Sequence, residues 1–289
     1  MNLILALILI FFIFLLGIIP FFLLYLFSDL MYIVLYRIFG YRKKVIYKNL
    51  SQSFPDLNKK DLNKLMSRAF INLADIIVEG IKGFTMTHGQ IKRRHKILNP
   101  GIIEPLAKAG KSIIALPTHY GNWEWGALSP GLFFDNYNIV GFYKPLTNPY
   151  ADRFISKNRS RTGVTLASIY KTARAFENLK DTPTIYIMAA DQSPSNSKKS
   201  YWINFLGRDT AFLHGPEDYA RKYDIPLVYT EIQRIKRGYY ELNLTILADK
   251  PTELKEGEIT RRYAKMLETQ ILKKPENWLW SHRRWKLKR

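Results

Sequence analysis

The chain has 289 residues, of which 44 are Lys or Arg and 24 are Asp or Glu, so its formal net charge is +20. It contains no Cys, which excludes disulfides, thiol nucleophiles and zinc sites with Cys ligands. Its five His residues show no metal-ligand spacing, so we expect no metal cofactor. The excess of positive charge indicates a polyanionic partner: nucleic acid, an anionic membrane surface or an acidic carrier protein.

The first 40 residues are predicted to anchor the protein in a membrane. No residue from Leu3 to Phe27 is charged, and a helix of that length would extend about 37 Å, against a hydrocarbon core of about 30 Å. The segment lacks the basic start and the cleavage site of a signal peptide, so we expect it to be retained. A buried hydrophobic helix is the alternative. Pro20 allows a bend, so a re-entrant wedge is the alternative to a full span.

Two features follow this apolar segment. Residues 31–39 form a short apolar and aromatic stretch that could lie in the membrane interface as a second, shallow helix. Five basic residues lie on the C-terminal side of the apolar segment, and because Lys and Arg mark the cytoplasmic side of a span, we expect the main domain to face the cytoplasm. These residues are Arg37, Arg42, Lys43, Lys44 and Lys48.

Residues 41–289 are predicted to form one α/β domain. The stretch 43–84 is helical by its 3.6-residue apolar period. Helices and strands then alternate, which predicts a single mostly parallel or mixed sheet flanked by helices. The expected strands are 112–116, 138–143, 183–189, 226–233 and 239–247, the last two forming a hairpin at the sheet margin. The expected helices are 101–109, 122–132, 149–162, 169–179, 216–223 and 257–274, and 190–215 is expected to be a polar loop.

His119 and Glu124 follow the first of these strands. Ligand sites gather at strand ends in α/β sheets, and an imidazole beside a carboxylate can act as a general base. On one regular helix an offset of five residues would leave the two side chains about 140° apart. They can therefore meet only if His119 lies in a turn before the helix, which Gly121 and Asn122 would allow.

Two more polar groups follow the next predicted strands. Tyr143 and Lys144 come after the strand 138–143, and Asn148 then precedes a helix that begins with Pro149. On that helix Arg159 shares a face with Asp152, whereas Arg161 points elsewhere. Asp191 and Gln192 follow the strand 183–189.

The C-terminal residues 278–286 mix Trp with Arg. Trp at a membrane interface and Arg against phosphate are both reasonable in such a segment. Single-stranded nucleic acid is an alternative ligand for it, which the predicted anchor makes the weaker interpretation.

Taken in order, these residues resemble the bacterial lipid A late (secondary) acyltransferases, lauroyl and myristoyl transferases of the lysophospholipid acyltransferase superfamily. The resemblance covers nearly the whole chain. It is carried by Tyr41-Arg-Lys-Lys-Val45, Asn49-Leu50, Phe54-Pro55, the block His119-Tyr-Gly-Asn-Trp-Glu124, Tyr143-Lys-Pro, Asn148-Pro149, Asp152, Arg159, Asp191-Gln192 and the ending Trp278-Leu-Trp280-Ser-His-Arg-Arg-Trp-Lys.

The resemblance implies transfer of a fatty acyl chain from an acyl-carrier-protein thioester to a hydroxyl of a lipid A precursor. The reaction would occur at the cytoplasmic face of the bacterial inner membrane without a cofactor, and acyl-coenzyme A is the alternative donor. The implied catalytic residues are His119 and Glu124, supported by Arg159 and Asp191. The implied substrate-binding residues are Asn122, Tyr143, Lys144, Asn148 and Gln192.

In this mechanism His119 would take the proton from the hydroxyl while Glu124 orients its ring. Arg159 or a backbone N–H near Gly121 and Asn122 would stabilise the oxyanion. Lys144 stands where the family more often has Arg and lacks the bidentate fork. The cations expected to meet the acidic carrier are Lys157, Lys198 and Lys199.

Three rival interpretations remain open. The acceptor could be another lyso-lipid or glycolipid. The same residues could direct water, which would make the protein a hydrolase. The chain could also be a non-enzymatic, membrane-anchored basic binding protein, an interpretation that explains the charge but leaves the polar groups at three strand ends unexplained.

Overall fold

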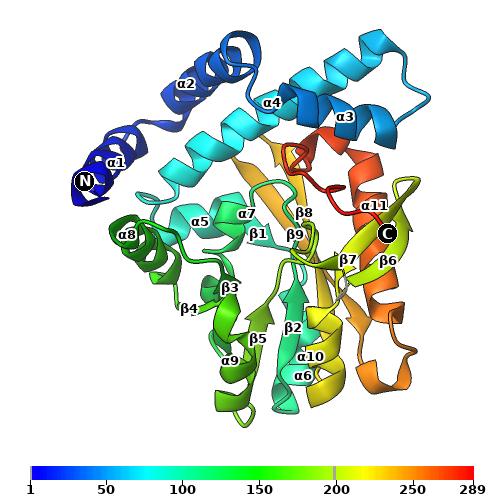
Figure 1. Cartoon of the computed structure of the whole chain (residues 1–289). Helices are drawn as coiled ribbons and strands as arrows, with labels where there is room; N and C mark the ends of the chain where they lie inside the picture. Colours follow the sequence, from blue (N-terminus) through cyan, green and yellow to red (C-terminus); the bar gives the residue numbers. More distant parts are fainter. Residues whose placement is uncertain (1, 198–199) are drawn as a thin grey trace.

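The computed structural model describes residues 2–197 and 200–289; Lys198 and Lys199, expected to contact the carrier, lie outside the described residues. Helices surround a central twisted sheet (Figure 1). Within the described residues, seven strands form this sheet in the order β1-β9-β8-β2-β5-β3-β4, and β6 and β7 pair separately. The strands are β1 (His95–Ile97), β2 (Ile113–Leu116), β3 (Asn138–Tyr143), β4 (Val164–Ser168), β5 (Thr184–Ile187), β6 (Ser200–Phe205), β7 (Arg208–Leu213), β8 (Leu227–Lys236) and β9 (Tyr239–Ala248).

The sheet is mostly parallel. β4, β3, β5, β2 and β8 run in one direction, β9 returns antiparallel to β8, and β1 lies parallel to β9 at the edge. The expected hairpin 226–247 is therefore confirmed, although β1 covers its outer side. The α/β fold class predicted from the alternation of elements is also confirmed.

The helices cover both faces of the sheet and extend beyond one end of it (Figure 1). They are α1 (Asn2–Gly17), α2 (Phe21–Ile33), α3 (Lys43–Ser53), α4 (Lys59–Lys82), α5 (His88–Arg94), α6 (Glu104–Lys108), α7 (Trp123–Gly126), α8 (Pro149–Ser160), α9 (Thr172–Asn178), α10 (Gly215–Tyr223) and α11 (Glu258–Lys273).

Apolar side chains pack on both faces of the sheet because successive side chains in a strand point to opposite faces. In β2, Ile114 belongs to the core beneath α10, α11 and the start of α4. Its neighbour Ile113 belongs to the core that contains Trp125 of α7. The sheet is thus buried on both sides, as expected of parallel strands.

The sequence pattern missed several short elements. The expected helix 122–132 is only α7 followed by a 3-10 turn at Pro130–Leu132, because Pro130 has no N–H with which to continue an α-helix. β4 occupies the gap between two expected helices, and the polar loop 190–215 contains the hairpin β6–β7. β1 has three residues, too few to show a period.

The apolar N-terminal stretch forms two helices rather than one. α1 ends at Gly17 and α2 begins after Pro20, so the expected helix over 3–27 is interrupted at the proline. Within the described part of the chain, one helical segment, Phe21–Ile38, is long and apolar enough to cross a membrane. Both α1 and α2 lie beside α4 (Figure 1). The division at residue 40 into anchor and acyltransferase domain stays a prediction.

Candidate active site

The polar groups that follow three predicted strands lie at one edge of the sheet. β2, β5 and β3 are neighbouring parallel strands, so their carboxyl ends meet. A pocket of about 730 Å³ opens there, and His119, Glu124, Tyr143 and Arg159 all line it. The structure therefore brings together side chains that are separated by up to 40 positions in the sequence.

His119 is held by a buried carboxylate. Its Nδ1 lies 2.7 Å from Oδ1 of Asp191, and its backbone N–H donates to Oδ2 of the same residue at 2.9 Å. Trp278 Nε1 donates to that Oδ2 at 3.0 Å. The side chain of Asp191 is 1% exposed and that of His119 is 23% exposed, so the imidazole stands between a buried anion and the open pocket.

The charges of this pair shift both pKa values. Burial alone would lower the pKa of His119, but the charge of Asp191 and its hydrogen bond outweigh burial and leave that pKa above its usual value. For Asp191, burial would raise the pKa, but His119, its backbone N–H and Trp278 lower it to about 2. The carboxylate is therefore ionised at neutral pH and accepts a proton on Nδ1 of His119, which leaves Nε2 available as a base.

Glu124 is bonded to Arg159 instead of to His119. Both carboxylate oxygens accept from Arg159 Nη2, at 3.0 and 2.8 Å. The partner that fixes the His119 ring is thus Asp191, which corrects the expectation that Glu124 orients it. Glu124 lies close enough for its negative charge to raise the pKa of His119. Arg159 also keeps a buried Nε without a partner among the described residues.

The turn between His119 and Glu124 is tightly fitted. Gly121 has φ +61°, and a Cβ there would lie 3.0 Å from Cγ2 of Ile232, so the position requires glycine. The Gly121 N–H donates to the carbonyl of Asn277 at 2.9 Å, and so it is not free to bind an oxyanion. The sharp turn is what allows the five-residue offset that a regular helix would forbid.

Asn122 is fully buried below this turn. Its Oδ1 caps α7 by accepting from the Trp125 N–H at 2.9 Å, and its Nδ2 donates to Glu79 at 2.7 Å. Both ends of the amide are therefore used inside the protein. Asn122 therefore holds the turn, and its assignment as a substrate-binding residue stays a prediction.

The remaining predicted binding residues take different positions. Tyr143 lines the pocket, and its hydroxyl donates to Asp152 at 3.1 Å. Asn148 is the N-cap of α8 and accepts from two backbone N–H groups, so it starts the helix that carries Arg159. Lys144 is exposed and Gln192 is half-buried.

Arg161 binds carbonyls after α4, away from the pocket, as its helical position predicts.

The aromatic C-terminal segment is part of the core. Trp278, Trp280 and Arg284 are at most 4% exposed, so the expectation that they meet a membrane interface or phosphate is wrong. Tyr120 forms a β-bridge with Trp278, which brings the Trp278 indole to Asp191. The Trp and Arg content of the segment was visible in the sequence, but the role of Trp278 depends on this long-range pairing.

A second cavity adjoins the pocket. It has a volume of about 550 Å³ and a lining that is almost entirely apolar, including Ala115, Ile185 and Leu242. It shares the four lining residues Pro117, Gly126, Ile187 and Ile232 with the His119 pocket. An apolar chain whose head lies at His119 could thus extend between the strands.

No group of three or more His, Asp or Glu residues that could hold a metal ion occurs among residues 2–197 and 200–289. The pocket itself presents a base, a cation and the carboxylate of Glu124, and the carboxylate of Asp191 is buried behind His119.

Comparison with known proteins agrees with these features. The chain is 22% identical over 248 residues to the lipid A biosynthesis lauroyltransferase of Escherichia coli (strain K12), covering 85% of this chain and 79% of that protein. It is 20% identical over 247 residues to the lipid A biosynthesis palmitoleoyltransferase of the same strain, with the same coverage. A family described as bacterial lipid A biosynthesis acyltransferase matches residues 2–287. With this match over nearly its whole length, the chain belongs to the bacterial lipid A biosynthesis acyltransferase family.

Proposed function

We propose that the protein transfers a fatty acyl chain from an acyl-carrier-protein thioester to a hydroxyl group of a lipid A precursor. The observation that carries the proposal is the hydrogen bond between His119 and the buried Asp191 at the mouth of an apolar cavity. The family and the names of the similar proteins support the reaction class and the lipid A pathway.

In the proposed reaction, Nε2 of His119 removes the proton from the acceptor hydroxyl as its oxygen attacks the thioester carbonyl carbon. Asp191 stabilises the resulting imidazolium. The C–S bond then breaks, and the carrier thiolate takes the proton from Nε2, so the base is regenerated and no covalent enzyme intermediate is needed. A positioned base typically contributes a factor of about 10²–10⁴ in rate.

Arg159 supplies positive charge at the pocket. Glu124 holds its Nη2, which leaves other N–H groups of the guanidinium for the oxyanion or for a phosphate of the acceptor. A donor of this kind is typically worth about 10²–10³ in rate. In this assignment Glu124 positions Arg159 and adds negative charge near His119, and Tyr143 contacts substrate from the pocket wall.

The acyl chain would occupy the apolar cavity next to the pocket. Its lining comes from β1, β2, β5, β8 and β9 and from segments on either side of α7, so it lies against one face of the sheet. Burial of each methylene contributes about 0.8 kcal/mol, so in this apolar cavity a longer acyl chain binds more tightly than a shorter one as long as it fits.

The basic surface of the protein can bind both an acidic carrier protein and an anionic membrane. An exposed groove beside the end of the candidate span is lined by the cations Arg37, Lys43, Lys60, Lys64 and Arg68. Anionic headgroups would contribute about 1 kcal/mol per basic residue near the surface. We propose that this groove lies against the cytoplasmic face of the inner membrane and that other surface cations, including Lys157, meet the acidic carrier protein.

The test is acyl transfer in detergent micelles. Labelled acyl-carrier protein or acyl-coenzyme A is offered with a tetra-acylated lipid A precursor and, separately, with lysophospholipids. Transfer to the precursor that His119→Ala abolishes would establish the function. Transfer only to lysophospholipid would replace the acceptor, and product without any acceptor would indicate a hydrolase. No reaction with any pair would refute the proposal.

A further inference from the structure

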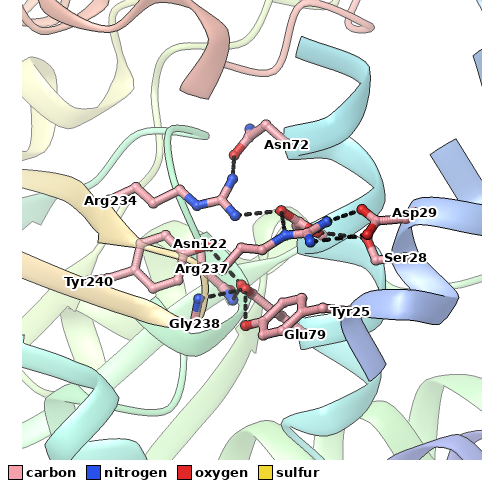
Figure 2. Close-up of polar contacts among 11 residues, drawn as sticks. Tyr25, Ser28, Asp29, Asn72, Glu79, Asn122, Arg234, Arg237, Gly238 and Tyr240 are labelled. Atoms are coloured by element: carbon pink, nitrogen blue, oxygen red, sulfur yellow. Dashed lines mark hydrogen bonds and ion pairs between the residues drawn. The ribbon is translucent and has the colours of Figure 1, made fainter. Parts of the chain in front are cut away.

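A buried carboxylate lies directly beneath the turn that carries His119 and Glu124. Glu79 of α4 is completely buried, and its two oxygens accept four hydrogen bonds (Figure 2). Oε1 accepts from the Tyr25 hydroxyl at 2.8 Å and from the Gly238 N–H at 3.0 Å. Oε2 accepts from Asn122 Nδ2 and from the Tyr240 hydroxyl, both at 2.7 Å.

Two of these four donors cannot reverse their role. A backbone N–H such as that of Gly238 can only donate. The amide of Asn122 is equally fixed, because its Oδ1 already accepts from the Trp125 N–H, so Nδ2 must face Glu79. Each oxygen of Glu79 therefore meets one obligate donor, and a tyrosine hydroxyl that can rotate completes each pair.

The same turn of α4 packs directly against α7. The carbonyl of Glu79 accepts from Trp125 Nε1 at 2.8 Å. A Cβ on Gly80 would lie 3.5 Å from Cγ of Glu124, so α4 touches the catalytic segment with both backbone and side chain. A shift of Asn122 relative to Glu79 would thus move Glu124 and, through the turn, His119.

A second carboxylate, one helical turn earlier, keeps this arrangement rigid. Asp75 is fully buried and accepts from Ser28 of α2 at 2.6 Å, and Arg234 and Arg237 of the β8–β9 hairpin bind it as ion pairs. Arg237 also pairs with Asp29 of α2. Figure 2 shows how side chains from α2, α4 and the hairpin converge around Arg237 and Glu79.

We infer that Glu79 is a positioning residue, which fixes the catalytic turn through Asn122 and joins it to the N-terminal apolar helix through Tyr25. Its role in catalysis rests on the proposed function; its role in fixing the turn does not. Removing a single acceptor here would displace the turn, and a misplacement of about 1 Å can lower a rate about 100-fold.

Swapping the carboxylate and the amide between positions 79 and 122 tests the inference. In Glu79→Gln the new NH₂ group meets an obligate donor on whichever side it lies, so the bond to Asn122 or to Gly238 is lost. In Asn122→Asp two carboxylates face each other in the interior. The double variant Glu79→Gln/Asn122→Asp restores the contact with reversed polarity, and Asp remains a good N-cap for α7. Tyr240→Phe is the matched control, because it removes a buried donor to the same oxygen and keeps the ring that packs against Gly121 and Trp125.

Each full-length variant would be measured in detergent micelles for kcat, KM and hydrogen–deuterium exchange of the amides in 120–128. We expect Glu79→Gln to lower kcat about tenfold to 100-fold with little change in KM, and to speed exchange in 120–128. We expect the double variant Glu79→Gln/Asn122→Asp to return kcat and the hydrogen–deuterium exchange rate to within about threefold of wild type. We expect Tyr240→Phe to change kcat by less than Glu79→Gln does.

The inference is overturned if the double variant stays as impaired as Glu79→Gln, or if Tyr240→Phe lowers kcat as much. If Glu79→Gln does not fold, the double variant alone decides: slow exchange in 120–128 supports the inference and fast exchange or failure to fold refutes it. If the wild type transfers no acyl group, the proposed function fails, whereas the exchange rates still decide the role of Glu79.

Discussion

Replacing Asp191 by Asn tests which carboxylate serves His119. The Oδ2 of Asp191 accepts from two groups that can only donate, the His119 backbone N–H at 2.9 Å and Trp278 Nε1 at 3.0 Å. In the Asn variant the single amide oxygen is needed for these two donors. The NH₂ group must then point at Nδ1 of His119, where the carboxylate now accepts at 2.7 Å.

This reversal changes the tautomer of the imidazole. Nδ1 must accept from the Asn NH₂, so the proton of the neutral ring moves to Nε2, the atom that should take the proton from the acceptor hydroxyl. The base is lost, and we expect kcat to fall by about 10²–10⁴. The three hydrogen bonds re-form without a charged partner, and because a hydrogen bond to a charged group is worth about 1.5–3 kcal/mol against about 0.5–1.5 kcal/mol for a neutral one, the melting temperature should fall while the protein stays folded.

The pH dependence of kcat/KM gives a second test of the role of Asp191. Transfer requires neutral His119, so kcat/KM should fall with decreasing pH through the raised pKa of the wild-type imidazole. Without the charge of Asp191, burial dominates and lowers that pKa, so the acid limb of the residual activity should move to lower pH. The same pair stabilises the fold below the unfolded His pKa, and this contribution is lost as the pH rises through the raised folded value.

Initial rates of acyl transfer from pH 5 to 9, with melting curves for both proteins, would measure these effects. An Asn variant with wild-type kcat, or with an unmoved acid limb and a large rate loss, would show that Asp191 does not set the state of His119.

Three further predictions concern the pocket, the cavity and the surface. Arg159→Gln should lower kcat about 10²–10³-fold with a small change in melting temperature, whereas Arg153→Gln on the exposed face of the same helix should leave kcat unchanged; equal rates for both would remove Arg159 from the mechanism. Ala115→Leu should shorten the preferred acyl donor, since each methylene excluded from the cavity costs about 0.8 kcal/mol, or roughly fourfold in kcat/KM, and an unchanged chain-length profile would place the acyl chain elsewhere. Replacing the groove residues Lys60, Lys64 and Arg68 together by Gln should weaken binding to anionic vesicles by about 3 kcal/mol, measured by co-sedimentation at fixed salt. Unchanged binding would show that the groove does not contact the membrane.

The sequence was sufficient for the sheet and for the location of the site. Long apolar runs such as those around β2 and β3 identify buried strands, and polar residues directly after them must collect at one edge of a parallel sheet. The edge strand β4 is longer than β2 but lacks a continuous apolar run, because Thr165 and Ser168 are polar, and β1 has only three residues. Pro20 was visible, but whether a proline bends or interrupts an apolar helix depends on what the two halves pack against, here α4.

The partner of His119 could not be read from spacing. Glu124 is close to it in sequence, but Asp191 reaches it from the neighbouring strand, where the bridge between Tyr120 and Trp278 completes the carboxylate's environment. Such contacts depend on register between distant segments. The identity of the side chains was predictable, whereas the pairing among them required the fold.

The two carboxylates near His119 differ in burial, and this difference suits them to different roles. The side chain of Asp191 is 1% exposed and accepts from three donors, whereas that of Glu124 is 34% exposed and, among the described residues, is bonded only to Arg159. A buried, fully bonded anion keeps its charge and its place, which a tautomer-fixing partner needs. The ion pair of Glu124 and Arg159 is partly exposed at the pocket, so Glu124 can hold Nη2 while other N–H groups of Arg159 remain for a developing oxyanion. We therefore propose that Asp191 orients the base, whereas Glu124 and Arg159 together provide the positive charge that the reaction needs.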